Sequence, residues 1–182
     1  MNTKLKAGIC GVLFAFASHA ALAATSAADF VDEASAKGIA EVEAGKLALE
    51  KSQSADIKTF AQMMIDDHTK ANQKLKAIAQ QKNIKVATDA ELLDKAKKLI
   101  LDIREESFDR SYANNQVKAH EDTIKLFQEE VNEGKDAEVK AFAGDTLPKL
   151  KEHLEAARKL AAAHGGDAAH DKEAVKQDAA KQ

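Results

Sequence analysis

The strongest constraint on the fold is a pattern of apolar residues that occurs twice along the chain. Residues spaced alternately four and three positions apart lie on one face of an α-helix, and in both copies that face is mostly apolar. The copies are Ile57, Ala61, Met64, His68, Ala71, Leu75, Ile78 and Val139, Ala143, Thr146, Leu150, His153, Ala157, Leu160. Ile57 corresponds to Val139, a shift of 82 residues, and each copy contains one histidine. Two such faces predict helices that pack against each other.

A second helical stretch precedes each copy. In the later half it is an apolar series over residues 113–131 that is broken only by His120, and its counterpart in the earlier half covers residues 31–49. Short polar breaks at 52–54 and 132–135 separate the members of each pair. We therefore predict two copies of a helical hairpin with a tight turn. One Pro and eight Gly are too few for the many turns of an all-β chain, which agrees with a helical fold.

The segment between the two halves, from about residue 80 to residue 106, is longer than neighbouring helices need for a connection. Thr88 and Glu91 form a capping box, and the apolar residues from Leu92 to Ile100 predict a short amphipathic helix after it. A connection of this length can run from one end of a bundle to the other. We predict an all-α fold: a ferritin-like four-helix bundle made of two duplicated αα-hairpins, joined by a long crossover that contains a short helix.

The two ends of the chain predict export and a polar tail. Residues 1–23 have the order of a cleaved signal peptide: Lys4 and Lys6, an uncharged apolar run over 7–17, and the small residues Ala21 and Ala23 before the cut. Cleavage removes Cys10, the only cysteine, and leaves no transmembrane segment. The bundle domain is then residues 24–162, and residues 163–182 form a disordered polar tail. We expect a protein secreted across the inner membrane, and the periplasm as its location.

Each of the four long predicted helices carries one ionisable residue near its middle: Glu41, His68, His120 and His153. Counted from the turns, at a rise of about 1.5 Å per residue, the first three lie within about one helical turn of each other in height. His153 lies about one turn further, unless a kink at Pro148 brings it back to the same height. Buried ionisable groups cost free energy unless they are hydrogen-bonded, paired or ligated. Imidazole and carboxylate together suit a divalent transition metal such as zinc, iron or copper. The alternative is a hydrogen-bonded polar layer that fixes the register of the helices.

The residues close to these four in the sequence indicate whether the predicted metal site holds one ion or two. Di-iron bundles place a carboxylate three positions before each ligating histidine, but Ile65, Val117 and Leu150 occupy those positions here. A di-iron centre is therefore not expected, and the metal hypothesis is a mononuclear site. Asp66 and Asp67 adjoin His68 but project away from its direction, so we expect them to face solvent or to take part in cap interactions and not to bind a metal.

The sequence lacks the motifs of other common binding and catalytic sites. With 30 acidic and 27 basic residues the chain has no basic face for nucleic acid. It contains neither a Gly-rich phosphate loop nor a Gly-x-Ser-x-Gly turn. We assign no catalytic residue and no organic cofactor site.

Several segments together resemble a family of exported bacterial proteins, domain of unknown function 4142, which belongs to the ferritin-like group. The matching segments are residues 41–48, 60–69, 108–112, His120, and 142–154. The resemblance extends over about residues 29–162. It implies a periplasmic or envelope location and a ferritin-like bundle, and it implies no established activity.

Three functions remain open at this point. The first is an exported helical bundle that acts as a non-enzymatic binding or stress-related module, with a mononuclear metal site formed by Glu41, His68, His120 and His153. The second is a metal-dependent redox enzyme that uses the same residues. The third is a purely structural protein whose outer helix faces meet a partner. The sequence identifies neither a protein partner nor a small ligand.

Overall fold

The computed structural model describes residues 26–101, 103 and 108–165. These residues form five α-helices and no strand: α1 (Ala27–Lys51), α2 (Ala55–Gln81), α3 (Asp89–Leu99), α4 (Phe108–Glu133) and α5 (Ala137–Ala163). The all-α prediction is confirmed. The signal peptide predicted at 1–23 lies outside the described residues, as does the tail beyond Gly165.

Local side-chain chemistry sets the helix ends. Ser26 and Asp136 each accept hydrogen bonds from backbone N–H groups of the first turn that follows, which caps α1 and α5. The capping box predicted at Thr88 and Glu91 is present at the start of α3, with both of its hydrogen bonds formed. The chain between α1 and α2 is only residues 52–54, as the polar break there predicts.

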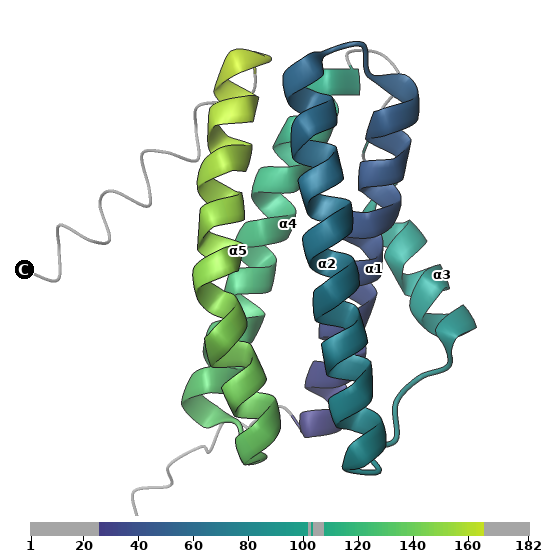
Figure 1. The fold of residues 1–182 in the computed structure, drawn as a ribbon, viewed down its shortest axis with the longest axis vertical. Coiled ribbons are helices and arrows are strands. Elements are labelled where there is room, and N and C mark those ends of the chain that lie inside the picture. Colours follow the sequence, from purple (N-terminus) through teal and green to yellow (C-terminus); the bar gives the residue numbers. More distant parts are fainter. Residues whose placement is uncertain (1–25, 102, 104–107, 166–182) are drawn as a thin grey trace, which may run out of the picture.

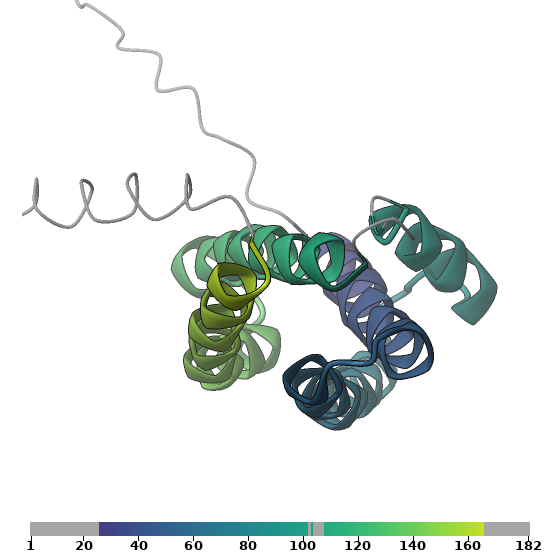
Figure 2. The same ribbon diagram turned by 90° about the horizontal axis from the view of Figure 1, so that it is seen from above.

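The four long helices lie side by side around a common axis. α1 packs on α2 and α4 packs on α5, while α1 also contacts α4 and α2 contacts α5 (Figure 2). The α1–α2 turn and the α4–α5 turn lie at opposite ends of the molecule (Figure 1). The crossover therefore returns the chain to the end from which α2 started, and α3 lies outside the group of four against α1.

The apolar core consists of two clusters at different heights along these helices. One cluster is built from Phe30, Val31, Ala34, Leu75, Ile78, Ala79, Leu126, Phe127, Val139, Phe142, Ala143, Leu147 and Leu150. The other is built from Ala44, Ala48, Ile57, Phe60, Ala61, Met64, Tyr112, Ala113, Val117, Leu154, Ala157, Leu160 and Ala161. On every long helix, one buried ionisable residue lies between the two clusters: Glu41, His68, His120 and His153. A polar layer thus divides the core.

One side of α1 differs from the sequence prediction. Val42 belongs to the apolar series predicted to face inward, but it is only half-buried and lines a groove of about 440 Å³ between α1, α2 and the crossover. The face of α1 that enters the core carries Ala34, Glu41 and Ala48. Small residues allow this close packing, since a Cβ atom at Gly45 would lie 2.9 Å from the backbone carbonyl oxygen of Ala61 on α2.

The end of α5 also differs from the prediction of a tail that starts at residue 163. Ala163 is helical, and the ring nitrogen Nε2 of His164 donates a hydrogen bond of 2.9 Å to Asp56 at the start of α2. No helix in the described part of the chain is both long enough and apolar enough to span a membrane.

Candidate metal centre

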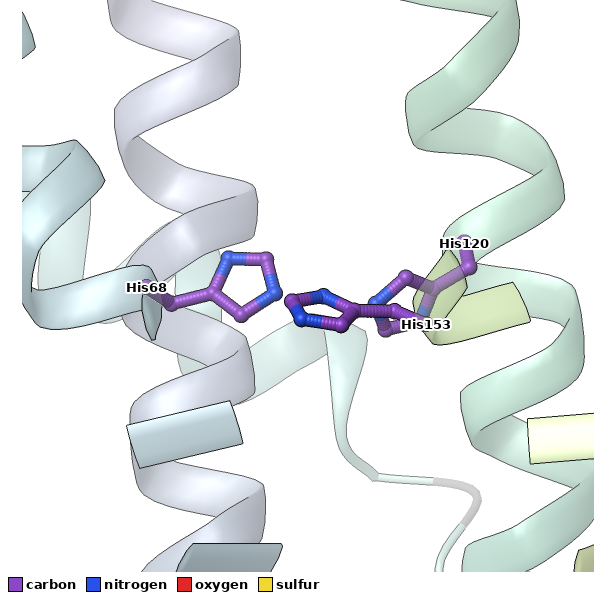
Figure 3. A group of neighbouring side chains, drawn as sticks. All are labelled: His68, His120 and His153. Atoms are coloured by element: carbon purple, nitrogen blue, oxygen red, sulfur yellow. The ribbon is translucent and has the colours of Figure 1, made fainter. Parts of the chain in front are cut away.

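Three histidine rings from three helices meet in the polar layer. His68 comes from α2, His120 from α4 and His153 from α5, and their ring centroids lie 5.4–5.6 Å apart (Figure 3). One ligand nitrogen from each ring lies within 4.8 Å of the other two. The residues are only 7%, 1% and 2% exposed, respectively. The structure therefore brings three of the four predicted site residues together in the buried interior.

Hydrogen bonds to the outer ring nitrogens fix two of these imidazoles. Nδ1 of His120 donates to the backbone carbonyl of Gln116 over 2.9 Å, and Nε2 of His153 donates to the carboxylate of Asp67 over 3.0 Å. Each acceptor oxygen requires the proton on that nitrogen, so the opposite nitrogen carries the lone pair. In both rings that opposite nitrogen is the one without a partner: Nε2 of His120 and Nδ1 of His153.

His68 is the third histidine of the cluster, and it also has a ring nitrogen without a partner. One of its ring nitrogens faces the other two rings and the second points away from them (Figure 3). Nε2 of His68 is buried and has no hydrogen-bond partner among the described residues. Three imidazole nitrogens that can act as acceptors are thus buried together, and no donor in the described part of the chain satisfies them. Buried polar atoms are rarely left this way in native proteins unless a water molecule or an ion completes them.

Burial favours the neutral form of His68 and His153. It lowers the pKa of His68 well below its ordinary value of 6.5, and the neighbouring His120 and His153 lower it further. Burial also lowers the pKa of His153, although the hydrogen bond to Asp67 acts in the opposite direction. A neutral imidazole is the form that binds a metal, so the environment favours the state that ligation needs.

Asp67 is a residue of the site that the sequence prediction missed. The sequence predicts that it faces solvent or takes part in a cap, but its side chain is only 29% exposed and it accepts the hydrogen bond that orients His153 on the neighbouring helix. Neighbouring positions on a helix point about 100° apart, so Asp67 and His68 face different partners. The helix period correctly separates the two residues, but it does not show that α5 packs where Asp67 points.

Glu41 is buried in the polar layer but is not part of the group of three. It is 5% exposed, and its Oε2 atom has no hydrogen-bond partner in the part of the chain that the structure describes. Burial raises the pKa of Glu41, whereas the nearby His120, Gln116 and Lys37 lower it. Burial, together with the charge of Glu41, raises the pKa of Tyr112. Glu41 is thus close to α4 and electrostatically coupled to one of the histidines.

The fold and this site define a class: an all-α protein with a cluster of three buried histidines at the middle of four long helices. Residues 14–160 match the family model described as Domain of unknown function (DUF4142). The chain therefore belongs to that family, as the resemblance in its sequence indicates. Comparison with curated proteins and with solved structures gives no match.

Proposed function

We propose that this chain is an exported metal-binding protein without enzymatic activity, in which His68, His120 and His153 bind one divalent transition-metal ion. One observation carries the proposal. Three unpartnered imidazole nitrogens lie within 4.8 Å of one another, so one ion between them can contact all three. On the side away from this ion, hydrogen bonds to the backbone carbonyl of Gln116 and to the carboxylate of Asp67 orient the rings of His120 and His153. Histidine ligands in metal sites nearly always donate their second ring N–H in this way, to a carboxylate or a backbone carbonyl.

The donor set fits a mononuclear site. Zinc commonly takes three histidines and keeps its fourth position open, with Zn–N distances of about 2.0–2.1 Å that place the nitrogens about 3.3 Å apart in a tetrahedron. The nitrogens here lie within 4.8 Å of one another, so a modest inward movement of the rings closes the site. The positions three before the histidines are apolar, Ile65, Val117 and Leu150, which argues against a second, bridged ion.

The proposal extends to fold class and location. The long crossover, the turns at opposite ends and the matching halves of the sequence support a ferritin-like four-helix bundle built from two duplicated hairpins. The order of charged, apolar and small residues over 1–23 supports export to the periplasm. Among divalent metals, a site of imidazoles follows the general affinity order in which copper and zinc exceed iron, so zinc and copper are the first ions to test.

The test is metal binding by the protein without residues 1–23 and without an affinity tag. After treatment with a chelator, the protein is dialysed against zinc or copper and its metal content is measured by elemental analysis. We expect one ion per chain. Protein that retains no metal above the level of a dialysed control would show that the three histidines form a structural polar layer.

Asp67 provides a prediction specific to this arrangement. Removal of its carboxylate in Asp67→Ala leaves His153 free to rotate, so we expect zinc affinity to fall by about 10–100-fold. The neighbouring Asp66 carries the same charge but hydrogen-bonds to Gln62 on the outer surface, so Asp66→Ala is the matched control and should bind zinc as the wild type does. Competition with a chromophoric chelator measures both. Equal losses in the two variants would point to a general effect of negative charge and not to orientation of His153.

A further inference from the structure

We propose that the bound ion keeps one coordination position open toward α1, and that Glu41 and Gln116 hold a water molecule or a small anion in this position. The inference rests on the proposed metal site and adds a ligand to it. Three of the four long helices supply a histidine, whereas α1 supplies none to the group. A tetrahedral ion bound by three histidines directs its fourth position away from all three, and the helix that remains on that side is α1.

At this height α1 presents a polar residue. Glu41 lies between the same two apolar clusters that enclose the histidines, and it is close enough to His120 and Gln116 for both to act on its pKa. Gln116 precedes His120 by one helical turn, so both lie on the same face of α4. The carboxyl group of Glu41 and the amide of Gln116 therefore border the side of the site where no histidine stands.

The polar atoms of this region are unsatisfied. Gln116 is completely buried, and neither its amide nitrogen nor its amide oxygen has a hydrogen-bond partner within the described ranges. Oε2 of Glu41 and the hydroxyl of Tyr112 are in the same condition. Leaving such groups unpaired in an apolar core is destabilising, because they have lost their hydrogen bonds to water. A small molecule on the metal that donates and accepts hydrogen bonds can satisfy Glu41 and Gln116 together.

Burial limits the ligand to a few atoms. Glu41, Gln116, His120 and His153 are 5%, 0%, 1% and 2% exposed, respectively. Apolar side chains close the layer above and below, Met64 and Val117 on one side and Leu150 on the other. The chemical class that fits is water, hydroxide or a compact anion such as azide that binds through one end.

Cobalt and azide provide the experiment. Co²⁺ replaces zinc in such sites and gives a visible spectrum that reports its ligands. X-ray absorption gives the total number of nitrogen and oxygen neighbours, and the outer-shell scattering of imidazole shows how many of them are histidines. We expect three imidazole nitrogens and one oxygen in the wild type, and a saturable spectral change with azide. In Gln116→Leu and Glu41→Leu we expect azide affinity to fall about 10-fold, with cobalt affinity within about 3-fold of the wild type and the oxygen neighbour retained as water.

A control variant and two kinds of contrary result distinguish a failure of this inference from a failure of the proposed function. Like Glu41, Glu130 is a buried carboxyl group, and neither of its oxygens has a hydrogen-bond partner among the residues that the structure describes. It lies near the far end of α4, so Glu130→Leu should leave azide affinity unchanged. Loss of the oxygen neighbour in Glu41→Leu would make Glu41 a direct ligand and overturn the inference, as would cobalt that binds at full affinity and never responds to azide. Failure to bind cobalt or zinc at all would overturn the proposed function itself.

Discussion

Saturating zinc should raise the free energy of unfolding of the wild-type protein by about 4 kcal/mol at a free concentration a thousand times the dissociation constant, and His120→Leu should abolish this gain. A ligand that binds only the folded state stabilises it by mass action, and the site exists only where three helices converge. His120 is the most buried of the three histidines, at 1% exposure, and a leucine has a comparable volume. Urea unfolding with zinc and with a chelator measures the difference.

His164, a histidine outside the cluster, is the control for zinc that binds elsewhere on the protein. His164 lies at the end of α5 and hydrogen-bonds to Asp56, outside the polar layer. His164→Leu should therefore keep the full stabilisation by zinc, whereas His68→Leu and His153→Leu should lose it as His120→Leu does. If zinc stabilised all four variants equally, the ion would bind elsewhere on the chain, and the cluster would not be the metal site.

The protein without metal should lose stability in acid through His68, and His68→Leu should suppress part of that loss. Burial holds the folded-state pKa of His68 well below the ordinary value of 6.5. Below about pH 6.5 the unfolded chain therefore binds a proton that the folded chain does not, and stability falls as the pH falls, by about 1.4 kcal/mol per unit for this one group. Above about pH 7.5 neither state is protonated at His68, and the effect vanishes.

The wild type must be compared with His68→Leu because two buried carboxyl groups change the pH dependence of stability in the opposite direction. Burial raises the pKa of Glu41 and of Glu130, so the folded state takes up their protons first and gains stability as the pH falls toward 4.5. Both groups are present in the wild type and in His68→Leu, so the difference between the two isolates the histidine. From urea unfolding in a chelator at pH 8, 7, 6 and 5, we expect the variant to gain about 2 kcal/mol relative to the wild type between pH 8 and pH 5. Parallel curves would mean that His68 takes up a proton in the folded state as easily as in the unfolded chain.

The sequence predicted the helices well because their signals are local. The capping box at Thr88 and Glu91 forms within four residues, and the polar break at 52–54 lies where α1 ends and α2 begins. Glu41, His68, His120 and His153 lie between the two apolar clusters, at the height that counting from the turns predicts for the first three. Rise per residue is a constant of the helix, so distance along the chain converts into height.

The apolar series predicts which face of α2 and of α5 turns inward, and most of its residues are buried. The sequence could not predict what the side chains beside these faces meet: Val42 lies in the groove beside α3, and Asp67 accepts a hydrogen bond from His153 on the neighbouring helix. The hydrogen bond between Asp67 and His153 joins residues 86 positions apart. Such a contact depends on which helices are neighbours and on how each is rotated about its axis, and both follow from the packing of the whole core.

The amino-acid sequence by itself determined that the chain is helical and where most of its helices begin and end. It also placed four ionisable residues near the middles of the helices. Side chains within about one turn of each other control these properties. Only the tertiary structure decided that three imidazoles face one another with their free nitrogens inward while Glu41 stays apart from them. Ring orientation is set by hydrogen bonds to an aspartate on another helix and to a carbonyl one turn away, and by the apolar clusters that exclude water from both sides of the layer.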